Sequence, residues 1–240
     1  MKKISRRITI ITNACLFLLI VGVFMVGFVP ERVVPINGGK EIGAIYNGNR
    51  EKRNVSIMIN VYENTKVVNG ILDVLSEKGA KATFFVGGCW ADDNQTTLIR
   101  IVNEGHEIAN HGYFHKDHAK LDVKGNEQEI SLTGTVVESL SGVRPTLFAP
   151  PSGSFSNTTL EVAYNLGYKV IMWSKDTIDW RDSDKTTIFN RATKNLTNGD
   201  FILMHPKAHT LSVLPKIIDF YKANGYDLVT VSESIGENGE

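Results

Sequence analysis

The feature that most constrains the fold is a repeated pattern in which a helix-like segment ends at a glycine and a short apolar run follows. The runs after these glycines are rich in β-branched and aromatic residues: Gly79 (KATFFV), Gly105 (HEIA), Gly142 (VRPTLFA), Gly167 (YKVIMW), Gly199 (DFILM) and Gly225 (YDLVTV). Glycine adopts the left-handed conformation just past a helix at low cost. Each break therefore predicts the end of a helix followed by a buried strand.

The segments before the breaks have the spacing of amphipathic helices. Residues 68–78, 98–104 and 211–223 carry apolar side chains every three or four positions. With a first strand at 55–61, the pattern predicts an α/β fold of about seven strand–helix units around a parallel sheet. Periodicity alone fits both an open doubly wound sheet and a closed (β/α) barrel.

The N-terminus predicts export from the cytoplasm. Residues 1–7 form a basic flank, and residues 8–29 form an apolar run long enough to span a bilayer. The positive flank favours a cytoplasmic N-terminus with the rest of the chain outside. We expect residues 8–29 to be a transmembrane anchor; the alternative is a signal segment that is cleaved to give a secreted protein. Residues 30–50 are expected to be a juxtamembrane linker, and 51–236 the folded domain.

The charge and cysteine content exclude two classes of protein, nucleic-acid binders and disulfide-rich proteins. Four of the 26 basic residues lie within residues 1–30, so the remainder carries 22 basic and 26 acidic side chains. A nucleic-acid binder needs a basic face, so no nucleic-acid partner is expected. Cys15 and Cys89 cannot form a disulfide framework.

Candidate chemical groups follow several of the predicted strands. His111 and His115 are four residues apart, a spacing at which two imidazoles can reach one metal ion if the segment is helical. His205 follows a buried strand directly and is a candidate for acid–base work. Asp179, beside Trp180, could orient such a histidine.

Five motifs together resemble those of the polysaccharide deacetylase family, the NodB-homology carbohydrate esterases. The motifs occur in the order and spacing of that family: KATFFVGG (81–88), GHEIANHGYFH (105–115), RPTLFAPPSG (144–153), DTIDW (176–180) and FILMHP (201–206). The resemblance implies a distorted (β/α) barrel. It also implies metal-dependent hydrolysis of the acetamide of N-acetylglucosamine-type glycans, such as peptidoglycan or chitin-like polymers. The implied cofactor is zinc or another divalent metal.

The resemblance assigns a role to each matching residue. It implies that His111 and His115 are metal ligands, that His205 is the general acid, and that Asp179 supports His205. It further implies three substrate-binding groups: the main-chain amide of Ser152 at the oxyanion, Trp180 beside Asp179, and Leu203 against the acetyl methyl group.

The first motif departs from the family pattern. Where the family has its catalytic base and its metal-binding aspartate, this chain has Asn60 and Val61, and the arginine that orients the base is replaced by Ala149. Asn60 is thus a degenerate base position, because an amide cannot take a proton from water. Valine offers no lone pair. Glu63 is a candidate substitute for the missing metal ligand. The alternative is that Glu63 is a solvated loop carboxylate with no role at the metal.

Two hypotheses of function remain open at this stage. The first is a membrane-anchored hydrolase of the cell envelope that removes N-acetyl groups slowly, with an improvised ligand set. The second is a non-catalytic pseudoenzyme that binds N-acetylated glycan or acts as a scaffold in cell-wall or spore formation. The chain also resembles a branch of the family that is found in spore-forming bacteria, and this resemblance suggests a role in sporulation.

Overall fold

In the computed structural model, residues 36–37 and 40–236 are described, and their strands form two sheets. A small antiparallel pair, β1 and β2, precedes a parallel sheet of eight strands. The strands are β1 (Ile36–Asn37), β2 (Lys40–Glu41), β3 (Asn54–Val61), β4 (Thr83–Val86), β5 (Glu107–Asn110), β6 (Leu147–Phe148), β7 (Lys169–Val170), β8 (Lys175–Asp176), β9 (Asp200–Met204) and β10 (Asp227–Leu228).

The parallel sheet is an incomplete barrel. Its order is β7-β6-β5-β4-β3-β9-β8, and β10 pairs with the beginning of β3. β7 and β8 are the two edges and are not paired with each other. The predicted α/β barrel is therefore confirmed as a parallel half-barrel.

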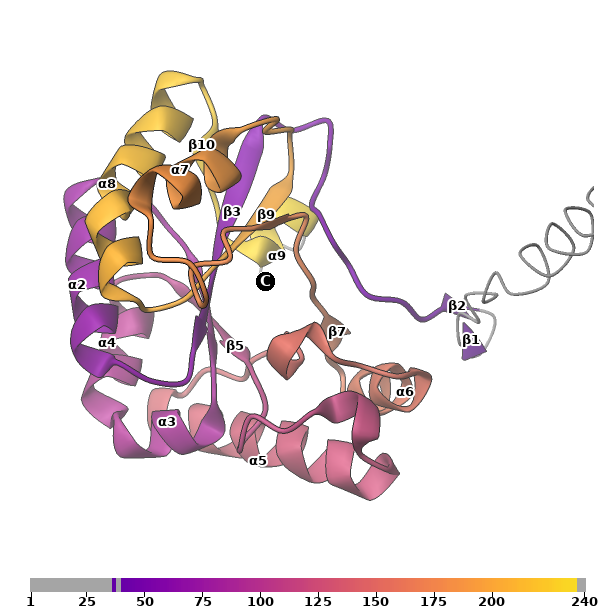
Figure 1. The fold of residues 1–240 in the computed structure, drawn as a ribbon. Coiled ribbons are helices and arrows are strands. Elements are labelled where there is room, and N and C mark those ends of the chain that lie inside the picture. The colour runs from indigo at the N-terminus through magenta and orange to yellow at the C-terminus, as the bar shows by residue number, and fades with distance from the viewer. Residues whose placement is uncertain (1–35, 38–39, 237–240) are drawn as a thin grey trace, which may run out of the picture. The chain divides into compact units, whose positions relative to one another are not determined.

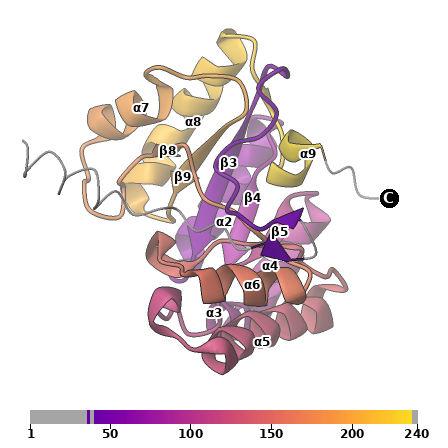
Figure 2. The same ribbon diagram turned by 90° about the vertical axis from the view of Figure 1, so that its right-hand side faces the viewer.

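Helices cover the outer side of this sheet. Figure 1 shows α2, α4 and α8 together on one side of β3 and β9, and in Figure 2 α9 lies on the other side. The α-helices are α2 (Thr65–Glu77), α3 (Gly88–Asp93), α4 (Gln95–Asn103), α5 (Val123–Ser141), α6 (Asn157–Asn165), α7 (Lys185–Thr193), α8 (Ala208–Ala223) and α9 (Val231–Ile235). Two short 3₁₀ helices, η1 (His118–Lys120) and η2 (Pro151–Gly153), lie between them.

Successive side chains of β3 enter different cores. Ile57 and Ile59 are buried in the main hydrophobic cluster beneath the helices. Met58 is buried in a separate cluster, with residues of β4, β5, β6 and β9, that fills the inside of the half-barrel. This alternation follows from the two-residue period of a strand, and it decides which residues at the end of β3 face the interior.

The glycine pattern predicted the helix–strand boundaries correctly. All six glycines have positive φ angles, between 54° at Gly79 and 83° at Gly167. Each predicted strand is present, although those at β6, β7 and β10 are only two residues long. The sequence pattern missed β8, because its two residues follow β7 without an intervening helix.

Part of the predicted linker belongs to the packed domain. Ile42 is buried, and Ile45 donates its main-chain N–H to the carbonyl of Val170 at 2.8 Å. Ile45 also pairs with Ile171, and Asn47 pairs with Asp200. These contacts place residues 42–47 along the open side of the half-barrel, before the expected domain start at residue 51.

The predicted membrane anchor, residues 8–29, lies outside the described residues. Within 36–37 and 40–236, none of the helices combines the length and the apolar character needed to cross a bilayer.

Lowering the pH is expected to destabilise the domain through His106, which precedes β5 and packs against the ring of Phe84. Burial lowers the pKa of His106 to about 4, so between about pH 6.5 and pH 4 only the unfolded chain protonates this ring. The contribution of His106 to the free energy of unfolding should therefore fall by about 3 kcal/mol across that range. Urea unfolding at about pH 7.5 and about pH 4.5 measures this loss. His106→Leu should lose less on acidification, and an equal loss in both chains would contradict the assignment.

Candidate active site

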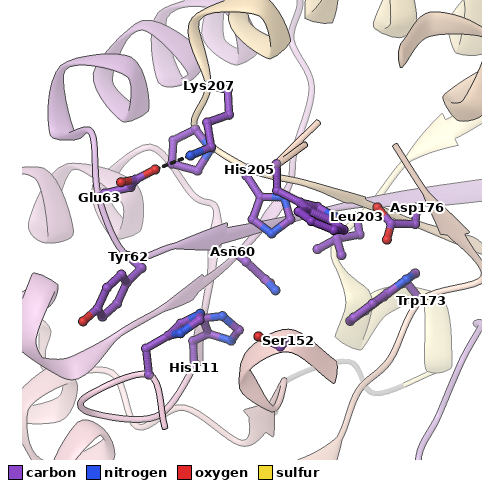
Figure 3. A pocket seen from close by; sticks show the side chains of 13 residues that line it. Asn60, Tyr62, Glu63, His111, Ser152, Trp173, Asp176, Leu203, His205 and Lys207 are labelled. Atoms are coloured by element: carbon purple, nitrogen blue, oxygen red, sulfur yellow. Dashed lines mark hydrogen bonds and ion pairs between the residues drawn. The ribbon is translucent and has the colours of Figure 1, made fainter. Parts of the chain in front are cut away.

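The main pocket lies at the carboxyl ends of β3, β5 and β9 and has a volume of about 550 Å³. In parallel-stranded barrels, chemistry is typically found at this end of the strands. The pocket (Figure 3) is lined by residues from across the chain: Asn60, Tyr62, Glu63, His111, His115, Ser152, Trp173, Asp176, Trp180, Leu203, His205, Pro206 and Lys207. The structure thus brings together all the sequence-predicted site residues except Val61 and Asp179.

Asp179 lies behind His205 and fixes its orientation. Its Oδ1 atom is 2.8 Å from His205 Nδ1, and its Oδ2 atom accepts from the main-chain N–H of His205, also at 2.8 Å. Thr210 Oγ1 donates to the same Oδ2 atom at 2.6 Å. Burial alone would raise the pKa of Asp179, but the bonds from His205 and Thr210 outweigh it and the pKa lies below its usual value. With Nδ1 held by the carboxylate, the other ring nitrogen of His205 is left for the pocket.

His111 and His115 lie beside each other on the opposite wall. Their ring centroids are 5.2 Å apart, and His111 Nδ1 is 2.7 Å from the carbonyl oxygen of Ala149. A carbonyl only accepts, so Nδ1 is the donor and Nε2 carries the lone pair. Burial lowers the pKa of His111 to about 3, so the ring is neutral at physiological pH. His115 has a positive φ of 56° and is not helical as the spacing argument assumed.

The loop that carries His115 is held by a buried carboxylate on α5. Glu129 Oε2 accepts from the main-chain N–H of Tyr113 at 2.9 Å and from that of Phe114 at 2.8 Å. Its Oε1 atom lies 3.1 Å from Lys116 Nζ, so its charge is balanced. Glu129 therefore positions this loop.

The alternation of β3 separates Asn60 from Val61. Asn60 lines the pocket and is 4% exposed, and its Oδ1 atom has no hydrogen-bond partner among the described residues. In Figure 3 its amide nitrogen points towards the centre of the pocket. Val61 is instead fully buried in the cluster beneath the helices. No carboxylate therefore stands at either position of the first motif.

Glu63 is engaged elsewhere. Its carboxylate forms an ion pair with Lys207 at the rim of the pocket. In the part of the chain that the structure describes, no three His, Cys, Asp or Glu side chains are grouped to hold a metal ion. Structural and catalytic zinc sites normally have at least three protein ligands. The two histidines present therefore do not fit the metal that the resemblance implies.

The predicted substrate-binding groups line the same pocket. Ser152 has left-handed φ and ψ angles of 56° and 16°, which turn the chain at η2. Leu203 is 2% exposed and belongs to the interior side of β9. Trp180 is 54% exposed, with the guanidinium of Arg181 5.7 Å from its ring centroid. Trp173 adds a second indole, which Figure 3 shows on the far side of His205 from Lys207.

Comparison with known proteins agrees with this arrangement. The family model described as polysaccharide deacetylase matches residues 47–171. The chain belongs to the polysaccharide deacetylase family. Among its relatives, it is 37% identical over 193 residues to the uncharacterized protein YlxY of Bacillus subtilis, with 80% of this chain and 60% of YlxY covered. It is 31% identical over 202 residues to a peptidoglycan N-acetylglucosamine deacetylase of Bacillus cereus, with 82% of this chain and 74% of the relative covered. The chain thus spans less than two thirds of the length of YlxY.

A solved structure with the same architecture is BA3943 of Bacillus anthracis, described as a CE4 family pseudoenzyme. It is 30% identical, with a TM-score of 0.80, and the match covers 83% of this chain and 71% of that one. A mutant of BA3943, which matches with the same TM-score, is described as having restored enzymatic activity.

Several residues of the site were not predicted from the sequence. Tyr62 and Lys207, which line the pocket, and Thr210, which donates to Asp179 behind it, belong to no family motif that the chain retains. Tyr62 lines the pocket, with its ring centroid 4.7 Å from that of His115. Lys207 lies in the loop after β9 and Thr210 in the first turn of α8, so their position directly after a buried strand was the signal that could have found them.

Proposed function

We propose that this chain is a glycan-binding member of the polysaccharide deacetylase family that holds N-acetylated envelope glycan without hydrolysing it at an appreciable rate. The observation that carries the proposal is the contrast between the two halves of the pocket. The His205–Asp179 pair and the two histidines are in place, whereas Asn60 and Val61 leave the first motif without a carboxylate.

Hydrolysis is handicapped at its first step. Attack on an amide carbonyl needs a water molecule that loses a proton, and the amide of Asn60 can hold water but cannot accept that proton. Loss of a general base typically lowers a rate by about 10²- to 10⁴-fold. The missing third ligand at Val61 reduces the activity further.

Binding has no such handicap. Leu203 offers an apolar contact to a methyl group, and the amide nitrogen of Asn60 is a donor aimed into the pocket. Trp173 and Trp180 offer faces on which sugar rings stack. These groups suit an N-acetylated sugar, and the B. cereus relative, named a peptidoglycan N-acetylglucosamine deacetylase, supports peptidoglycan as the source.

The proposal is tested by measuring binding and turnover together. The purified full-length chain is titrated with N-acetylglucosamine tetramer by calorimetry, and acetate release is followed with added Zn²⁺, Co²⁺ or Ni²⁺. We expect binding without acetate. Trp180→Ala should weaken binding about tenfold, because an exposed stacking face is lost. Tyr164→Ala, which removes an exposed aromatic ring on α6 outside the pocket, is the matched control.

The second candidate function is slow, metal-dependent deacetylation. The observation in its favour is the His205–Asp179 pair, which keeps the geometry of a general acid. Acetate release that disappears in His115→Ala would establish this function and overturn the first. Absence of glycan binding would overturn the first as well.

The cell envelope is the proposed location. Support comes from the basic flank 1–7 and the apolar run 8–29, which would anchor the chain with its domain outside. Recovery of the full chain in the membrane fraction of cells, open to added protease, is the expected result. A chain lacking residues 1–29 in the medium would instead indicate a cleaved signal. A role in spore formation stays a prediction from the sequence.

A further inference from the structure

A lysine–glutamate pair lies at the rim of the pocket, outside the residues used above for N-acetyl recognition. Glu63 follows β3 and Lys207 precedes α8, and both side chains line the pocket. The same two loops are joined again by Asn64, whose side-chain amide donates to the carbonyl oxygen of Pro206 at 3.2 Å. The loops are thus held together even when the carboxylate of Glu63 leaves the ammonium of Lys207.

The two partners differ in exposure. The side chain of Lys207 is 29% exposed and that of Glu63 is 52% exposed. An exposed ion pair of this kind adds little to the stability of a protein. A carboxylate on a ligand can therefore replace Glu63 at little cost, while Lys207 stays at the pocket.

The charged side chains around the pocket determine on which side a carboxylate of the ligand binds. Among the described residues that line the pocket, Lys207 is the only lysine or arginine. Lys207 also occupies the N-cap of α8, where no side chain caps the first turn and the helix dipole favours an anion. Asp176, in contrast, lies across His205 from Lys207 in Figure 3 and would repel a carboxylate.

From this arrangement we propose that Lys207 selects glycans in which the sugar next to the bound N-acetyl group carries a carboxylate. Glu63 acts as an internal competitor that occupies Lys207 until such a sugar arrives. The carboxylate-bearing sugar lies on the Glu63 side of the pocket and not on the Asp176 side. This inference rests on the proposed function and adds its ligand class: an acidic, N-acetylated glycan, such as one with lactyl ether carboxylates.

The test compares one glycan in a charged and a neutral form. The full-length chain is titrated with a tetrasaccharide of alternating N-acetylglucosamine and N-acetylmuramic acid, and with the same tetrasaccharide after methyl esterification. We expect the acid to bind about tenfold more tightly than the ester. Lys207→Gln should remove that preference and leave ester binding unchanged, and Lys207→Arg should retain it.

Glu63→Gln distinguishes the competitor role from a structural one. It should strengthen binding of the acid several-fold and leave binding of the ester as it was, because only the acid competes for Lys207. For Lys207→Gln, the matched control for the loss of one positive charge is Lys66→Gln, on an exposed lysine of α2 that does not line the pocket.

Equal binding of acid and ester, unaltered in Lys207→Gln, would overturn the inference and leave the proposed function standing. Tighter binding of the ester would also overturn it. Binding of neither form, nor of N-acetylglucosamine tetramer, would overturn both.

Discussion

The double variant Asn60→Asp/Val61→Asp is expected to release acetate from N-acetylglucosamine oligomers at least about 100-fold faster than the natural chain. Aspartate at position 60 faces the pocket, because Asn60 already does, and supplies the missing base. Aspartate at position 61 joins His111 and His115 as a third ligand once its carboxylate turns out of the apolar cluster in which Val61 lies. Acetate release in the presence of Zn²⁺, Co²⁺ or Ni²⁺ is the measurement.

The two substitutions should differ when made singly. Val61 is fully buried among apolar side chains, so Val61→Asp places a carboxylate where burial costs several kcal/mol unless it turns towards the histidines. Asn60→Asp replaces an amide of equal size and should fold normally. A folded double variant that releases no acetate would contradict the prediction. The buried Ala149, at the position of the base-orienting arginine, would then be the next residue to change.

The fold was predictable because its signals are local. A left-handed glycine after each helix and an apolar run after each glycine are both readable in the sequence, and both are present in the structure. The edges of the barrel were not predictable. β8 has no helix before it. Residues 42–47 pack against β7 and β9 through main-chain hydrogen bonds, and main-chain bonds leave no pattern of side chains in the sequence.

The site was predictable to the extent that it depends on strand ends. His111, Leu203 and His205 stand where parallel strands stop, so motif order alone brought them together. The orientation of single side chains was not predictable. Glu63 is next to the pocket in sequence and in space, yet its carboxylate pairs with Lys207, which is 144 residues away along the chain. The partner of Glu63 depends on how the loops after β3 and β9 meet in the folded chain.

Asp179→Ala is expected to lower the free energy of unfolding by about 2–3 kcal/mol, because the donors that its buried carboxylate satisfies lose their acceptor. Asp179 is 1% exposed and accepts three hydrogen bonds, two from His205 and one from Thr210. Without the carboxylate these donors stay buried and unpaired. Urea unfolding at neutral pH measures the loss. A loss under about 1 kcal/mol would mean that water replaces the carboxylate and that the pair is not what holds His205.

Asp179→Asn separates the charge of this residue from its shape. Asparagine keeps the volume but replaces one acceptor with a donor, so it should destabilise the domain less than alanine at neutral pH. The pKa of Asp179 is lowered in the folded state, because hydrogen bonds from His205 and Thr210 outweigh the opposing effect of burial. Its contribution to stability is therefore complete above the unfolded value of about 4 and is lost as the pH falls through the lower folded value. The stability difference between the natural chain and Asp179→Asn should accordingly shrink as the pH falls below about 4, and it should reach its acid value only below the lowered folded pKa, where the carboxyl group is neutral in both states. A difference that persists into strong acid would show that the shape of the carboxyl group, and not its charge, orients His205.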